Sequence, residues 1–354
     1  MNIKKVRLLE NVYDVCGGSR KEGLGFIYDA STPRGKCPLY KTLISNKCSY
    51  DCKYCNNRAG CDKYRADFEP EELAKTFIYL QRKHKLEGLF LSSAVNREPD
   101  KTTEKMLQAV RLVRNKYSYQ GYIHFKILPG VSFDLIKQAS EYADRLSINI
   151  ECPNKGRLTQ LSSNKEYKTD ILRRQAWIKK LHDNQTTQMV IGVADETDLE
   201  VLRMMEWEYK TFDLKRIYYS AFRPLKGTPL ENKAPESLLR QNRLYNVDFL
   251  IHKYNYNFKE FKEIMIDEML PKRKDPKLAI ALHNFEPVEI NEAEYSELIR
   301  VPGIGLKTAE KIIQTTANKK LKKRIELKQL GVILKRADPF IKIDGSYQKK
   351  LSLF

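Results

Sequence analysis

The chain has 354 residues, 42% of them hydrophobic, which suffices for a globular core and suggests roughly two to three domains. It has no apolar run long enough for a transmembrane helix, and its first ten residues lack a secretory apolar segment, so we expect a cytoplasmic protein. Lys and Arg number 64 against 45 Asp and Glu, and the formal net charge of +19 favours a polyanionic partner, most simply nucleic acid. Solvated lysines on an ordinary surface would give the same count.

Residues 1–36 are expected to form a loop-like N-terminal extension, because Gly and Ser punctuate them. Cys16, in this stretch, and Cys37, just after it, could ligate a second metal, although a free buried thiol is the commoner role.

Residues 37–235 alternate between strands and helices. The expected strands are Thr42–Ser45, Gly88–Ser93, Tyr122–Leu128, Arg145–Glu151, Thr187–Gly192 and Arg216–Ser220. The expected helices are Pro70–Leu80, Thr102–Tyr117, Phe133–Tyr142, Thr169–Asp183 and Asp198–Thr211, the last capped by Asp195 or Thr197. This order predicts an α/β fold with a parallel sheet of six βα units, too few to close an eight-stranded barrel. Function gathers at the carboxyl ends of strands in such barrels, so polar residues at the strand ends are candidate site residues.

Three cysteines follow the first expected strand with C-x3-C-x2-C spacing: Cys48, Cys52 and Cys55. Clustered thiols in a chain with seven cysteines fit a metal in a reducing compartment better than a disulfide framework. Soft sulfur ligands select zinc, copper(I) or iron–sulfur clusters. A zinc loop would need a fourth ligand, Cys61 or Cys37, whereas three cysteines on a [4Fe–4S] cluster leave one iron open for chemistry.

The cysteine spacing, with Tyr54 just before the last cysteine, resembles the radical S-adenosylmethionine (SAM) superfamily. The resemblance implies a partial (β/α)6 TIM-like barrel, a [4Fe–4S] cluster on the three cysteines, and SAM bound to the open iron and cleaved to a 5′-deoxyadenosyl radical. It places Tyr54 near the adenine and assigns SAM contacts to strand-end residues. These are Ser92 and Ser93, which replace the usual Gly-Gly-Glu segment, and Asn149, Glu151 and Gln188. The sequence identifies no catalytic residue.

Loop-like residues end the barrel by position 235, and residues 236–285 are expected to be a helical linker. Residues 286–342 form a third expected domain, and residues 343–354 a tail. Pro302-Gly303-Ile304-Gly305 resembles the hairpin of a helix-hairpin-helix (HhH) motif. Glycines allow a tight turn and close approach of a ligand, so the hairpin amides and the next helix, with Lys307 and Thr308, would bind a DNA phosphate.

A degenerate second hairpin is expected near Leu327–Leu334, after a basic run at Lys319–Arg324. The hairpin could instead serve only to pack against the barrel.

The strand-end segments and the terminal Val301-Pro-Gly-Ile-Gly305 together resemble one family, the DNA modification/repair radical SAM proteins, over nearly the whole chain. The resemblance implies a radical SAM enzyme that modifies or repairs DNA. It also implies a functional link to a uracil-DNA-glycosylase-like protein and a need for an electron donor such as flavodoxin or ferredoxin. An RNA (tRNA) modifying radical SAM enzyme and a DNA-binding protein with a structural cluster are the alternatives.

Overall fold

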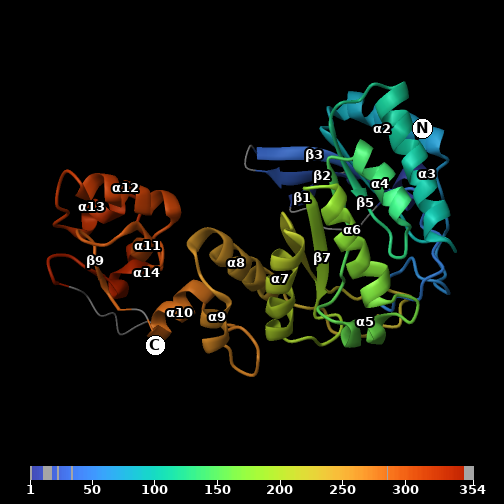
Figure 1. The fold of residues 1–354 in the computed structure, drawn as a ribbon. Helices are drawn as coiled ribbons and strands as arrows, with labels where there is room; N and C mark the ends of the chain where they lie inside the picture. Colours follow the sequence, from blue (N-terminus) through green and yellow to red (C-terminus); the bar gives the residue numbers. More distant parts are fainter. Residues whose placement is uncertain (1, 11–17, 22–23, 33–34, 285, 347–354) are drawn as a thin grey trace. The chain divides into compact units, whose positions relative to one another are not determined.

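The structure is a computed structural model that describes residues 2–10, 18–21, 24–32, 35–284 and 286–346 (Figure 1). It divides into two compact units, Met1–Glu196 with Arg203–Ser237, and Thr197–Leu202 with Leu238–Phe354. Each unit is described by itself below. No helix in the described part of the chain is long and apolar enough to cross a membrane.

The first unit is built on one curled sheet with strand order β1-β2-β3-β4-β5-β6-β7-β8. Strands β1 to β3 pair antiparallel, and β3 to β8 are the six parallel strands of the expected partial barrel. The strands are β1 (Gly18–Lys21), β2 (Leu24–Thr32), β3 (Gly35–Leu43), β4 (Gly88–Ser92), β5 (Tyr122–Lys126), β6 (Arg145–Ser147), β7 (Gln185–Ile191) and β8 (Arg216–Ala221).

Helices follow the parallel strands and cover one face of the sheet (Figure 1). They are α2 (Pro70–His84), α3 (Pro99–Arg111) with the π-turn η1 (Leu112–Lys116), α4 (Phe133–Tyr142), and η2 (Tyr167–Leu172) with α6 (Arg173–Leu181). Helix α1 (Ile3–Leu8) precedes the sheet, α5 (Lys155–Leu161) lies in the connection between β6 and η2, and α7 (Asp198–Phe212) connects β7 to β8.

Helix α2 shows why the local sequence sets these bounds. Pro70 and two glutamates occupy its first turn, and Arg82, Lys83 and His84 occupy its last turn. The charges at both ends therefore interact favourably with the helix dipole. Lys85 then adopts a left-handed conformation and ends the helix. On its apolar side, Phe77 stacks on Tyr40 of β3, with ring centroids 6.4 Å apart.

Two expectations for the first unit differ from the structure. Residues 18–32, expected to be loop-like, form β1 and β2, because they pair with the long strand β3 that also extends the expected strand Thr42–Ser45 toward Gly35. Helix α5 is an element that the sequence did not predict. Cys16 lies outside the described residues.

The second unit is helical: α8 (Leu238–Tyr254), α9 (Phe258–Glu263), α10 (Pro276–Asn284), α11 (Tyr295–Leu298), α12 (Leu306–Thr316), α13 (Arg324–Gln329), α14 (Leu334–Ala337) and η3 (Asp338–Phe340), with the short parallel pair β9 (Val288–Glu289) and β10 (Ile341–Lys342). Within the expected helical linker, α9 ends at Glu263, and Ile266 and Met269 form an antiparallel bridge.

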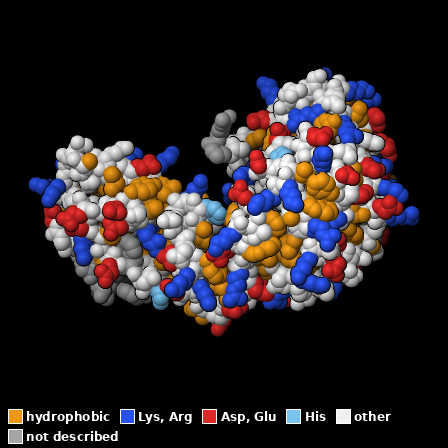
Figure 2. Space-filling view, in the orientation of Figure 1, with side chains coloured by type: hydrophobic (Ala, Val, Ile, Leu, Met, Phe, Trp, Pro, Cys, Tyr) orange, Lys and Arg blue, Asp and Glu red, His pale blue; other side chains and the backbone are white. Residues whose placement is uncertain are grey.

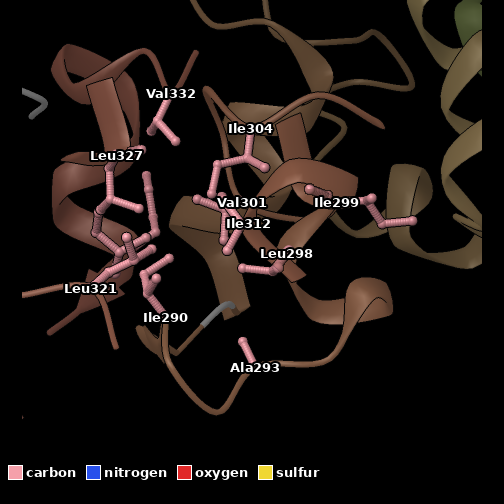
Figure 3. Packing of buried hydrophobic residues seen from close by; sticks show 14 of the residues in the cluster. Ile290, Ala293, Leu298, Ile299, Val301, Ile304, Ile312, Leu321, Leu327 and Val332 are labelled. Carbon is pink, nitrogen blue, oxygen red and sulfur yellow. The ribbon is translucent and has the colours of Figure 1, made fainter. Parts of the chain in front are cut away.

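Figure 3 shows the apolar core of this second unit, in which side chains from several short elements point toward one another. Leu298, Val301 and Ile312 come from the two helices and turn of the first hairpin, and Leu327 and Val332 come from the second. None of them is more than 3% exposed. Because each helix here is short, this shared core rather than helix propensity stabilises the hairpins.

Candidate functional site

The three clustered cysteines lie on the long loop between β3 and α2, which is anchored by backbone hydrogen bonds. Ser49 N donates to Val95 O at 2.8 Å, beyond the carboxyl end of β4. Lys53 N donates to Leu161 O at 2.9 Å, at the end of α5. The loop therefore lies at the carboxyl edge of the sheet, as expected for a functional loop of a parallel barrel.

Arg65 holds the second half of this loop. Its guanidinium donates four hydrogen bonds to backbone carbonyls, those of Asn46, Asn57, Arg58 and Cys61, at 2.7 to 3.1 Å. The planar fork of five N–H groups suits arginine to bind several carbonyls at once. Asn46 is fully buried and closes the loop from the other side by accepting from Ala66 N at 2.8 Å.

Asp51 ties the cysteine loop to the segment after α5. Its carboxylate accepts from the hydroxyls of Ser162 and Ser163 at 2.5 and 2.7 Å and from Ser163 N at 3.0 Å. Burial raises the pKa of Asp51, but these hydrogen bonds together outweigh it, and the pKa lies well below the ordinary value. The carboxylate is therefore charged throughout the physiological range and clamps the two loops together.

The three cysteines themselves suit a cluster better than a single ion. Burial raises the pKa of Cys52, and it raises the pKa of Cys55 to about 12, with the neighbouring cysteines adding to both shifts. Thiols with raised pKa values are held as thiolates when a metal takes the proton's place. Tetrahedral zinc would draw its sulfurs to about 3.8 Å from one another. In the described part of the chain, no three His, Cys, Asp or Glu side chains gather in a way that could hold a single metal ion.

Both alternative fourth cysteines of a zinc site make other contacts in the structure. The Cys61 thiol donates to Gly227 O at 2.8 Å. Cys37 packs with Leu39 and Phe90 on the sheet. Three soft sulfurs on one loop fit a [4Fe–4S] cluster with one open iron.

Glu151 lies next to the cysteine loop with a left-handed backbone, at φ 64°. A non-glycine residue in this region is strained, and such strain concentrates at functional sites. Its side chain forms a buried ion pair with Lys165 (3.2 Å) and accepts a hydrogen bond from Tyr54. Burial and then Glu151 raise the pKa of Tyr54. Burial lowers the pKa of Lys165, but Cys52 and Glu151 together raise it more, so this lysine is a cation among the thiols.

The other residues predicted to contact SAM lie on the same edge. Glu151 N donates to Gln188 O at 3.0 Å, which places the ends of β6 and β7 side by side. Asn149 accepts a hydrogen bond from the buried Lys126 of β5. Ser92 ends β4, and Ser93 Oγ donates to Ala94 O at 2.7 Å.

Sequence reasoning missed Lys165, Asp51 and Arg65. Lys165 follows a helix that was not predicted, so nothing in the local pattern indicated that it lies beside the cysteines. The partners of Asp51 are more than a hundred residues away. Only Arg65 could have been proposed from the sequence, since it lies in the loop that carries the three cysteines.

In the second unit, the first hairpin joins α11 to α12. Gly303 has φ 90°, and a Cβ there would lie 2.7 Å from Ile333 O of the second hairpin. Ile333 N in turn donates to Gly303 O at 3.0 Å. Glycine is therefore required at position 303 because it allows the two hairpins to contact each other. From the sequence alone, its expected role is instead to allow close approach of a ligand.

The remaining hairpin residues divide between core and surface. Pro302 and Ile304 are buried, and Ile304 N donates to Val301 O at 3.1 Å within the turn. Gly305 is the N-cap of α12, a Cβ there would have open space apart from Tyr254 Oη at 3.8 Å, and Thr308 is half-buried in the first turn. Lys307 is exposed. The donors that can face a phosphate are therefore the N–H groups of the first turn of α12, which have no partner within the helix.

A buried lysine lies beneath this hairpin. Lys277 of α10 donates to Ile304 O at 2.7 Å and lies 4.6 Å from the centre of the Tyr254 ring. Burial, and next the positive charge of Arg336, lower its pKa to about 7. Burial therefore favours the neutral amine of Lys277.

Comparisons with known proteins agree with both units. The radical SAM superfamily matches residues 42–207, and the helix-hairpin-helix motif matches residues 283–336. A comparison with curated proteins finds no match.

Among solved structures, methylornithine synthase (PylB) is similar with a TM-score of 0.51 and 16% identity over 59% of this chain and 60% of that one. The FeFe-hydrogenase maturase HydG from Carboxydothermus hydrogenoformans is similar with a TM-score of 0.50 and 14% identity over 59% of this chain and 50% of that one. The chain thus spans between 50% and 60% of the length of these two structures, and at such low identity the likeness shows the fold.

The superfamily match covers the cysteine loop and the strand ends that surround it, and the motif match covers both hairpins. The chain therefore matches the radical SAM superfamily over residues 42–207 and the helix-hairpin-helix motif over residues 283–336.

Proposed function

We propose that the protein generates a 5′-deoxyadenosyl radical from SAM to modify or repair DNA. The observation that carries this proposal is the presence of a radical SAM domain and a helix-hairpin-helix motif in one chain. Helix-hairpin-helix contacts go to the DNA backbone, so the motif positions the polymer and leaves recognition of the target to the enzyme domain.

In this proposal, Cys48, Cys52 and Cys55 hold the cluster, which when bound would supply the electron that cleaves SAM. Tyr54, Ser92, Ser93, Asn149, Glu151 and Gln188 surround SAM at the carboxyl edge of the sheet. Glu151, fixed by Lys165 and by its strained backbone, presents a carboxylate beside the cluster loop. That carboxylate suits the ammonium or ribose hydroxyls of SAM, both of which are hydrogen-bond donors.

The hairpin residues Pro302, Gly303, Ile304, Gly305, Lys307 and Thr308 form the DNA-binding part of the proposal. Pro302, Gly303 and Ile304 shape the turn, whereas Gly305, Lys307 and Thr308 bring the start of α12 and a positive charge to a phosphate. Figure 2 shows lysines and arginines spread among acidic side chains over the drawn face, so the net charge alone does not locate a nucleic-acid surface. A target base inside a duplex would have to be flipped out to reach the radical.

The proposed functional partners are a uracil-DNA-glycosylase-like protein and an electron donor such as flavodoxin or ferredoxin. Both are part of the proposal because the family that the sequence resembles implies them.

The first test measures 5′-deoxyadenosine formed from SAM by anaerobically reconstituted, reduced protein, with and without duplex DNA. We expect turnover, and we expect duplex DNA to change its rate. A protein that binds its cluster but never cleaves SAM would leave only a structural role for the cluster.

The second test measures duplex binding over a range of salt concentrations. Lys307→Gln should weaken binding and lower the slope of log affinity against log salt by about 0.9, the value expected for one lost phosphate contact on B-DNA. Lys262→Gln, at an exposed lysine of α9 in the same unit, is the matched control and should leave the slope unchanged. Tighter binding of tRNA than of duplex DNA at equal salt would move the substrate to RNA.

A further inference from the structure

Two adjoining hollows open beside α2 in the first unit. Their volumes are about 700 Å³ and about 510 Å³, and Ile78, Arg82 and Tyr117 line both of them. The larger one is also lined by Glu87 and Tyr122, which lie at the amino ends of β4 and β5. Volumes of about 300–1,000 Å³ are typical of ligand sites. We call the two hollows together the α2 groove.

One side of α2 gives the smaller hollow its positive charge. Lys75, Tyr79 and Lys83 are spaced four residues apart, so they lie along one stripe of the helix. Arg82 lies next to this stripe, and all four side chains are exposed. Lys83 Nζ is 5.6 Å from the centre of the Tyr79 ring, and the Arg82 guanidinium has no hydrogen bond or ion pair with any residue that the structure describes. No acidic residue lines this hollow, so it suits an anion.

The loop between η1 and β5 forms the other wall of the groove, and hydrogen bonds hold it in place. Arg114 donates to Tyr119 O at 2.9 Å and to Gly121 O at 2.7 Å. Tyr119 Oη donates to Glu87 O at 2.8 Å, and a Cβ at Gly121 would overlap that hydroxyl. The wall is therefore formed before any ligand binds, with Tyr117 half-buried between the two hollows.

The larger hollow adds hydrogen-bonding groups to the Tyr117 ring. The side-chain amides of Gln81 and Gln120 and the carboxylate of Glu87 line it and offer both donors and acceptors. A nucleobase can use this combination, because it has a π-face for stacking and polar edges for hydrogen bonds. A phosphate joined to that base would reach the smaller hollow, where lysine and arginine can form charge-assisted hydrogen bonds with it.

The α2 groove lies at the opposite edge of the sheet from the cysteine loop. Strands β4 and β5 have five residues each. At about 3.3 Å per residue, the amino and carboxyl edges are roughly 16 Å apart. A ligand in the groove is therefore separate from SAM and from the group on which a radical would act.

We propose that the α2 groove binds a free nucleoside monophosphate, with its phosphate on Lys75, Arg82 and Lys83 and its base against Tyr117. This site is additional to the proposed reaction on DNA and does not depend on it.

The test measures binding of uridine 5′-monophosphate and guanosine 5′-monophosphate to the reconstituted full chain by isothermal titration calorimetry. Saturating SAM is present, so that neither nucleotide can occupy the SAM site, and no reductant is added, so that SAM is not cleaved. Wild type is compared with Arg82→Gln and Tyr117→Leu. The matched control is Arg203→Gln, at an exposed arginine of α7. The hairpins are intact in every variant, so their contribution is the same.

We expect at least one of the two nucleotides to bind wild type and the control equally. Arg82→Gln should weaken this binding at least about tenfold, because a charge-assisted hydrogen bond is lost. Tyr117→Leu should weaken it at least about fivefold through the lost stacking contact. Inorganic phosphate and the matching nucleoside should each bind at least about tenfold more weakly than the nucleotide, because each makes only part of the contacts.

If Tyr117→Leu lowers the melting temperature, Arg82→Gln at its exposed position still decides the outcome. A folded Arg82→Gln protein that binds the nucleotide as tightly as the Arg203→Gln control would overturn this inference. So would wild type that binds neither nucleotide, or that binds inorganic phosphate as tightly as the nucleotide. The proposed function would stand in each case, since 5′-deoxyadenosine formation and duplex binding test it separately.

Discussion

The cysteine loop and the first hairpin each present a binding turn, but different forces hold them in place. Polar contacts stabilise the cysteine loop. Arg65 donates hydrogen bonds to four carbonyls, and Asp51 accepts hydrogen bonds from two serines. In the hairpin, buried Val301 and Ile304 anchor the turn in an apolar core, and Gly303 meets the backbone of the second hairpin.

This difference follows from what each turn has to present. A cluster needs several sulfurs on a long irregular loop, whose carbonyls and amides must all find partners when buried. A phosphate needs only the free end of a helix, so a short turn on a packed core suffices. Substitutions that remove polar contacts should therefore damage the cysteine loop, whereas substitutions that add bulk should damage the first hairpin.

The largest expected effect is on the thiols. Cys48→Ala/Cys52→Ala/Cys55→Ala should lose the iron and all 5′-deoxyadenosine formation, because these thiols are the proposed ligands of the cluster. Iron and sulfide content and SAM cleavage measure this. Cys61→Ala is the control and should keep its iron, since that thiol contacts Gly227 O. A triple variant that retained iron and cleaved SAM would remove these cysteines from the site.

Arg65→Met should open the cysteine loop, because it leaves four carbonyls without their charged donor. We expect a loss of about 3 kcal/mol or more in the stability of the loop and a lower iron content after reconstitution. Arg58→Met is the control, since Arg58 Nε contacts the single carbonyl of Asp51 in the same loop. Equal iron content in the two variants would show that Arg65 does not organise the loop.

In the hairpin, Gly303→Ala should destabilise the second unit by about 1–3 kcal/mol, because alanine at φ 90° is strained and its Cβ would meet Ile333 O. Denaturant unfolding measures this. Gly305→Ser should leave the fold intact, since serine is a good N-cap and has space there.

The same Gly305→Ser variant should weaken duplex binding if a phosphate approaches that backbone. The loss of one charge-assisted hydrogen bond corresponds to about 1.5–3 kcal/mol. Unchanged affinity in a folded Gly305→Ser protein would remove the hairpin from the phosphate contact.

The smallest expected effect is the pH dependence from Lys277. Its pKa is about 7 in the folded unit and 10.5 as the ordinary value, so between pH 7 and 9 the unfolded chain binds a proton that the folded unit does not. The free energy of unfolding of the second unit should then rise with pH, by about 2 kcal/mol over this interval. Lys277→Met should remove this rise, and chemical denaturation at pH 7 and 9 measures it. The same rise in both proteins would assign it to other groups.

Secondary structure could be predicted wherever residues of the segment itself determine where that segment begins and ends. The helix over Phe133–Tyr142 agrees with α4, and the hairpin at residues 302–305 lies between α11 and α12 as expected. β1 and β2 were missed because their Gly-rich sequence pairs only when β3 offers an edge. For the site, the cysteines and the strand-end residues could be predicted, whereas Lys165 could not, because its contact with Glu151 exists only after β6 and the loop after α5 meet.

By itself, the sequence determined the kind of ligands that this protein carries: three thiols at a spacing that suits a cluster, and a glycine hairpin before a helix that suits a phosphate. Both signals are local, since spacing along the chain sets which atoms can reach one centre. Only the tertiary structure decided what holds the cysteine loop and why Gly303 must be glycine. Those features join residues far apart in the chain, and their contacts depend on strand register and packing, which no short segment contains.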